Sequence, residues 1–126
     1  MDTAALIRVA KAQVKNATTS LGPPGLIELY LDEIPVQISR RGKPGRAGRA
    51  GFFHGLGPGD VGRIVINVGV CYTEERFMKT LYHELAHAVN AWIHGKNVDT
   101  HGPLWKAVME RLGQPPERCH HYHDRI

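Results

Sequence analysis

The amino-acid sequence predicts an α+β domain, in which a small antiparallel or mixed sheet has helices packed on one face. Apolar residues recur at helical spacing near the start of the chain and again in its middle, and a segment rich in β-branched residues stands just before the second of these helices. The chain has 126 residues, of which 42% are hydrophobic, and this suits one core. We therefore interpret residues 1–126 as a single domain.

Residues 3–19 are predicted to form the first helix, because their apolar positions lie three or four residues apart. These positions are Leu6, Ile7, Ala10 and Val14. Arg8, Lys11 and Lys15 fall on another face of the helix, which we expect to be solvated. Two prolines and two glycines within residues 21–25 then end the helix.

The sheet is expected to come from several short segments. Residues 26–31 and 34–38 are predicted as two strands, and Pro35 places the second at a sheet edge or just after the proline. Strand character resumes near Phe52, and we expect the phenylalanines there to belong to the core. Residues 63–70 give the strongest strand prediction, because Ile and Val dominate them.

A basic segment separates these strands. Residues 39–51 hold five Arg or Lys residues and no acid, and their glycines favour a flexible loop. The five are Arg40, Arg41, Lys43, Arg46 and Arg49. Because clustered cations suit the phosphate backbone of a nucleic acid, we expect flexible contacts there that do not depend on base sequence. The net charge of +4 is compatible with a polyanionic partner.

Two more helices follow the last strand. Thr73 is a suitable N-cap for a long helix that should run to about His94, with Gly95 placed to end it. A short helix is expected to open at 102–103 and to stop at Gly113. Residues 114–126 then form a C-terminal tail.

The long helix carries a pattern typical of metal sites. His83 and His87 stand four residues apart, so both imidazoles lie on one helix face and can reach one ion. Glu84 projects to the side, where it can act as general base on a water molecule. An apolar stripe on another side of the helix lets these residues face a cleft. The stripe consists of Phe77, Leu81, Leu85, Val89 and Trp92.

A catalytic zinc site needs a third protein ligand, and the residues leave more than one choice. A metzincin would need glycine and histidine where Asn90 and Ile93 stand, so that class is excluded. His101 is one candidate and Glu110, on the last helix, is another. A closed structural zinc site is a further alternative, with Cys119 or a tail histidine as fourth ligand.

Taken together, these segments resemble the SprT-like metallopeptidase domain, the family that includes the DNA–protein crosslink protease Spartan. The resemblance rests on the run His-Glu-Leu-Ala-His-Ala at 83–88, then Trp92, then His-Gly-Pro-Leu-Trp-Lys at 101–106. It covers roughly residues 63–113 strongly and the earlier part weakly. Many members of the family carry a cysteine-rich zinc ribbon after the protease domain, which one cysteine in the tail cannot form.

The resemblance implies a zincin-like fold, one Zn²⁺ per chain, and His101 as the third ligand beside His83 and His87. It also implies an endopeptidase, with Glu84 as catalytic base, that acts on DNA-bound or DNA-crosslinked proteins. DNA is then a partner, with single strands among the candidate forms. The alternatives are a metallopeptidase of another clan with a substrate unrelated to DNA, and a non-catalytic DNA-binding module with structural zinc.

The sequence also gives expectations about the protein's surroundings. It lacks an apolar run long enough for a signal peptide or for a membrane span, so we expect no membrane partner. Cys71 and Cys119 cannot build a disulfide framework, and Cys71 is expected to be a small buried residue. We expect an intracellular monomer, in the cytoplasm or nucleoid (the nucleus in a eukaryote).

Overall fold

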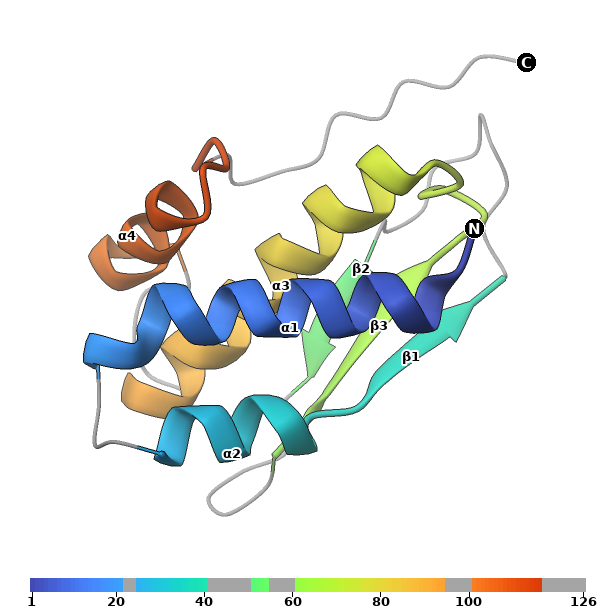
Figure 1. Cartoon of the computed structure of the whole chain (residues 1–126). Helices are drawn as coiled ribbons and strands as arrows, with labels where there is room; N and C mark the ends of the chain where they lie inside the picture. Colours follow the sequence, from blue (N-terminus) through green and yellow to red (C-terminus); the bar gives the residue numbers. More distant parts are fainter. Residues whose placement is uncertain (22–24, 41–50, 55–60, 95–100, 117–126) are drawn as a thin grey trace.

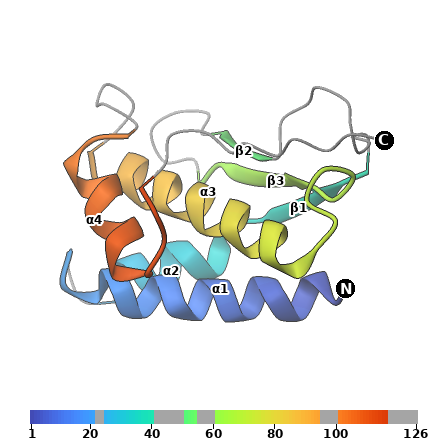
Figure 2. The same ribbon diagram turned by 90° about the horizontal axis from the view of Figure 1, so that it is seen from above.

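The molecule is organised around its longest helix, α3 (Glu74–His94). The structure, a computed structural model, describes residues 1–21, 25–40, 51–54, 61–94 and 101–116. Within these ranges α3 lies between the sheet and α1 (Thr3–Thr18), as two views at right angles show (Figures 1 and 2). The helix thus has neighbours on opposite sides, and its position decides where the candidate site can lie.

The sheet is mixed, which is one of the two arrangements that the sequence predicts. It contains β1 (Val36–Ser39), β2 (Gly51–His54) and β3 (Arg63–Asn67) in the order β1-β3-β2. β3 pairs in parallel with β1 and in antiparallel orientation with β2. Ile64 and Ile66 are fully buried toward the helices, and Figure 2 shows the helices on one side of the sheet. The predicted α+β class with helices on one face is confirmed.

The strand predicted at 26–31 is wrong, because this segment forms the helix α2 (Leu26–Glu33). Gly25 precedes it with a φ of 86°, a left-handed conformation that glycine adopts without steric cost. Ile27, Tyr30 and Leu31 are buried, and their spacing is that of a helix. Burial of this one face outweighed the β-propensity of the individual residues.

The first helix is confirmed, and Arg8 is exposed as predicted, but Lys11 and Lys15 are only partly exposed. Lys11 donates a hydrogen bond from Nζ to the carbonyl oxygen of Ile34 (2.6 Å), at the C-terminal end of α2. Lys15 forms an ion pair with Asp32 of α2. Loss of solvation lowers the pKa of Lys11, although the negative charge of Asp32 opposes this shift. The lysines therefore join α1 to α2.

Helix α3 begins as predicted, since the backbone N–H of Arg76 donates to Oγ1 of Thr73 (3.2 Å). Four residues of its apolar stripe are fully buried: Phe77, Leu81, Leu85 and Val89. Trp92 is the exception, at 38% exposed, and it stacks on Tyr30 with ring centroids 5.3 Å apart. Tyr82, Ala86 and Ala88 are buried as well, because α1 and α4 cover other sides of the helix.

The last helix, α4 (Pro103–Arg111), starts at the predicted proline and is followed by Gly113, whose φ is 70°. It packs on α3 through an apolar cluster separate from the main core. This α4 cluster consists of Ala86, Trp105, Val108 and Met109. Nη1 of Arg111 also donates to the carbonyl oxygen of Ala17 (2.9 Å), near the end of α1. In the ranges that the structure describes, no helix is both long and apolar enough to cross a membrane.

The contact between β2 and α3 leaves no room for a side chain at Gly51. A Cβ atom placed there would lie 2.9 Å from Cγ2 of Thr80 and 2.9 Å from the carbonyl oxygen of Val65. We predict that Gly51→Ala lowers the free energy of unfolding by about 1–3 kcal/mol, because strand or helix must shift. Urea denaturation measures this change, and an unaltered midpoint and slope would mean that β2 has space to move.

Candidate metal centre

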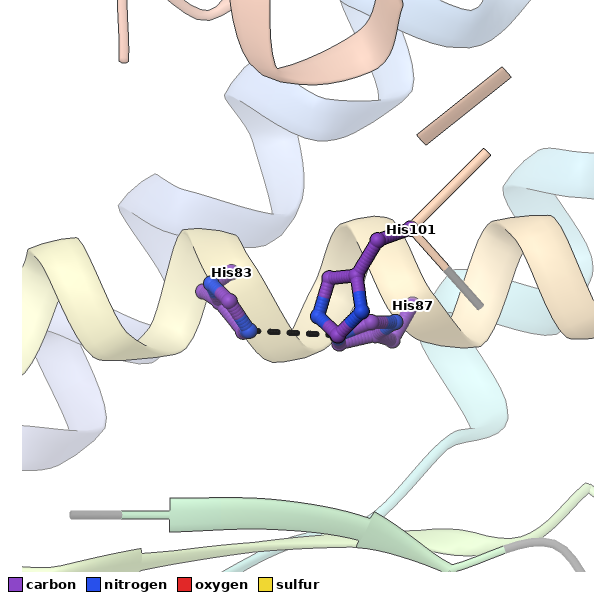
Figure 3. Close-up of side chains that lie close together, drawn as sticks. All are labelled: His83, His87 and His101. Atoms are coloured by element: carbon purple, nitrogen blue, oxygen red, sulfur yellow. Dashed lines mark hydrogen bonds between the residues drawn. The ribbon is translucent and has the colours of Figure 1, made fainter. Parts of the chain in front are cut away.

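Two imidazoles of α3 approach each other closely in the middle of the helix. Nε2 of His83 and Nε2 of His87 are 3.1 Å apart, and Figure 3 shows both rings on the same side of the helix. Their four-residue spacing places them one turn apart, as the sequence predicts. His83 is 5% exposed, so this pair lies close to the interior of the protein.

His101 completes a group of three. It enters from the segment just before α4, and its ring centroid lies 4.4 Å from that of His87 and 5.7 Å from that of His83 (Figure 3). One ring nitrogen from each histidine lies within 4.8 Å of the other two. Glu110 is exposed on α4 and does not belong to this group. The structure thus brings His101, and not Glu110, to the pair on α3.

The donor set suits a transition metal such as zinc. Neutral imidazole nitrogen is a frequent zinc ligand at about 2.0–2.1 Å, and tetrahedral geometry puts two such ligands about 3.3 Å apart. The 3.1 Å between His83 and His87 is already close to that value. Three protein ligands would leave a fourth position for water or substrate, which is typical of catalytic zinc sites. The three histidines could therefore hold a metal ion, and the geometry is compatible with zinc.

Glu84 lies next to His83 on α3 and is 5% exposed. Its surroundings include Cys71, whose Sγ lies 3.3 Å from Oγ1 of Thr80, one helical turn before Glu84. Burial raises the pKa of the Cys71 thiol, and the negative charge of Glu84 adds to this rise. Cys71 is fully buried, so the prediction that it is a small interior residue is confirmed.

Trp105 is a part of the site that sequence reasoning missed. Its ring contacts all three imidazoles, with centroid distances of 5.1 Å to His83, 5.4 Å to His87 and 4.8 Å to His101. The indole is fully buried, and Nε1 donates to the carbonyl oxygen of His83 (3.4 Å). His101 lies before the first residue of α4, so helical spacing does not relate it to Trp105, and no local pattern could have signalled the contact.

The candidate nucleic-acid residues fall mostly outside the structure's described ranges. Arg40 is exposed and directly follows β1. Arg41, Lys43, Arg46 and Arg49 lie outside the described residues, as does the tail from residue 117, including Cys119. The predicted loop at 39–51 overlaps both neighbouring strands, because β1 extends to Ser39 and β2 starts at Gly51.

The amino-acid sequence is similar to one family of known proteins. A family model described as the SprT-like family matches residues 28–123. A protein named Protein SprT from Pseudomonas fluorescens is 35% identical over 51 residues, which cover 40% of this chain and 31% of that protein. Protein SprT from Pseudomonas paraeruginosa is 38% identical over 50 residues, covering 38% of this chain and 30% of that protein.

The alignments therefore span about a third of the length of these curated relatives. No solved structure gives a significant match to the chain. The family match, by contrast, extends over most of the sequence, from within α2 to the tail, and it includes all three clustered histidines. The chain belongs to the SprT-like family.

Proposed function

We propose that this protein is a zinc-dependent endopeptidase of SprT-like type, with one zinc ion per chain held by His83, His87 and His101. The observation that carries the proposal is the convergence of three imidazole nitrogens within 4.8 Å, two from α3 and one from the segment before α4. Membership of the SprT-like family supports it as well. In this proposal the fourth position is open to reactants, unlike that of a closed structural site.

In this proposal the metal ion, Glu84 and the three histidines have separate roles. When bound, zinc supplies Lewis-acid chemistry, which polarises a peptide carbonyl and makes water more acidic. Glu84 directly follows His83, so its carboxylate can accept a proton from the attacking water. Glu84, now a carboxylic acid, then donates that proton to the nitrogen of the leaving amine. His83, His87 and His101 would hold the ion and take no part in proton transfer.

We further propose that the peptidase associates with DNA and cleaves proteins that are bound or crosslinked to it. Arg40 is exposed beside the sheet, and four more basic residues follow it in the sequence before β2. The net charge of +4 favours approach to a polyanion. This part of the proposal also rests on the resemblance to the family that contains Spartan.

The test is cleavage of an unfolded protein such as casein by zinc-loaded protein, with and without single-stranded DNA. We expect fragments that disappear on addition of a zinc chelator and return when zinc is restored. Fragments that form faster with DNA would support the DNA-associated form of the proposal. Cleavage that persists in excess chelator, or no cleavage by fully loaded protein, would refute the assignment.

Neutralising the basic segment should weaken DNA binding. Replacing Arg40, Arg41, Lys43, Arg46 and Arg49 with glutamine removes cations that would displace counterions from the phosphates. Each lost contact should flatten the slope of log K against log salt by about 0.7 for a single strand, or up to about 3.5 in total. Fluorescence anisotropy with a labelled oligonucleotide at several salt concentrations measures this slope.

Single variants provide a matched control for the basic segment. Arg8→Gln removes one exposed charge from α1, and Arg40→Gln removes one exposed charge beside β1. Only Arg40→Gln should change the slope of log K against log salt. Equal slopes for the five-residue variant and the wild type would exclude this segment from DNA contact.

A further inference from the structure

We propose that Trp105 is a positioning residue of the metal centre, whose indole holds the three histidine rings in the arrangement that an ion requires. The inference rests on the proposed metal site but not on the cleavage reaction. Its basis is that one fully buried side chain of α4 contacts all three imidazoles.

The contacts restrict the rings in complementary ways. Trp105 stacks on His87 with an angle of 24° between the ring planes. It meets His83 and His101 edge to face, at 72° and 87°. Aromatic rings favour both arrangements at centroid distances of about 4.5–7 Å. Rotation of any one imidazole about its ring torsion would break its contact with the indole.

The indole itself is fixed from two sides. It belongs to the α4 cluster, where Ala86 stands between His83 and His87 in the sequence and its small side chain lets the ring approach α3. Its N–H donates to the carbonyl oxygen of His83 (3.4 Å). The surface that the histidines meet is therefore anchored to the helix that carries two of them.

A packed ring suits this task because it does not compete for the ligand atoms. Hydrogen-bonding partners in an outer shell orient metal-binding histidines by engaging one ring nitrogen. The one N–H of the indole goes to the carbonyl oxygen of His83, so Trp105 restricts the imidazoles by packing and makes no hydrogen bond to a ligand nitrogen. Preorganisation of this kind raises metal affinity, because the ion need not order the ligands when it binds.

The experiment compares zinc affinity in the wild type, Trp105→Leu and Trp105→Phe, by competition with a chelating dye. Trp105→Leu keeps an apolar group but loses the ring, and we expect affinity to fall about 10–100-fold, as for other residues that orient ligands. Trp105→Phe keeps a ring and should recover most of the loss. Trp92→Phe is the matched control, because Trp92 stacks on Tyr30 instead, and it should bind zinc like the wild type.

Cobalt absorption provides a readout that stability alone would not move. The visible bands of bound Co²⁺ depend on ligand geometry, so they should change in Trp105→Leu and persist in Trp105→Phe. A folded Trp105→Leu protein with wild-type affinity and an unaltered cobalt spectrum would overturn the proposal. A Trp105→Phe protein that binds zinc as weakly as a folded Trp105→Leu protein would overturn it as well.

A second measurement covers the case in which Trp105→Leu does not fold. In the Trp92→Phe protein, Trp105 is the remaining tryptophan. Co²⁺ should quench its emission, and the Co²⁺ concentration at half-quenching should equal that at which the absorption bands reach half their height. Unchanged emission at full occupancy would contradict the contact on which the inference depends. Wild-type protein that binds zinc but cleaves nothing would refute the peptidase proposal alone, so the two failures are distinguishable.

Discussion

Glu84→Gln is expected to abolish peptide cleavage while the protein keeps its metal. Glutamine has nearly the same volume as glutamate but cannot accept a proton from water, and general acid–base groups contribute about 10²–10⁴-fold to rates. Because Glu84 is 5% exposed, a substitution of equal size disturbs its surroundings least. The measurement is kcat/KM for a peptide substrate, together with zinc content by elemental analysis.

Glu75→Gln is the matched control for this experiment. It makes the same chemical change on the same helix, at an exposed position in the first turn of α3. Its activity should equal that of the wild type. Full activity in Glu84→Gln would remove Glu84 from the reaction, and loss of zinc in that variant would instead show that it helps to hold the metal site together.

His101→Ala is expected to lose the metal ion. Changing a residue that only orients a ligand typically costs about 10–100-fold in metal affinity, and removing a ligand should cost more. The two imidazoles on α3 would remain, but two ligands do not complete the three protein ligands of a catalytic zinc site. Elemental analysis after dialysis should find one zinc per chain in the wild type and much less in the variant.

Glu110→Ala tests the alternative third ligand in the same assay. Glu110 is exposed and stands apart from the clustered histidines, so its removal should leave zinc content unchanged. Circular dichroism of both variants shows whether the helices are intact. The opposite pattern, with zinc retained in His101→Ala and lost in Glu110→Ala, would show that Glu110 is the third ligand.

Much of the fold could be predicted from apolar periodicity, and the failures have a common cause. Helices α1, α3 and α4 have clear spacing and clear end signals, such as Thr73 and Gly113. In α2, eight residues give only about two turns, and a run of Leu, Ile and Tyr has β-propensity as well. What decides between the two is which face is buried, and this depends on α1 packing against the segment.

The candidate site was predictable in part for the same reason. The pair His83 and His87 lies within one helix, so local spacing is enough to bring the rings together. The choice between His101 and Glu110 depends on how α4 docks, which no local pattern encodes. The contact of Trp105 with all three rings has the same origin, because it requires α4 and α3 to pack through Ala86.

The division of the interior into two clusters separates the stability of the site from the stability of the whole fold. The main core joins α1, α2, α3 and the sheet, whereas α4 is held by its own smaller cluster and by Arg111, with Leu21 and Leu112 packed against both clusters. Proteins open in such units, and a small cluster opens at lower free energy than the global core. Detachment of α4 would carry His101 away while His83 and His87 stay in place, so we expect the lifetime of a bound ion to depend on this local opening rather than on global unfolding alone.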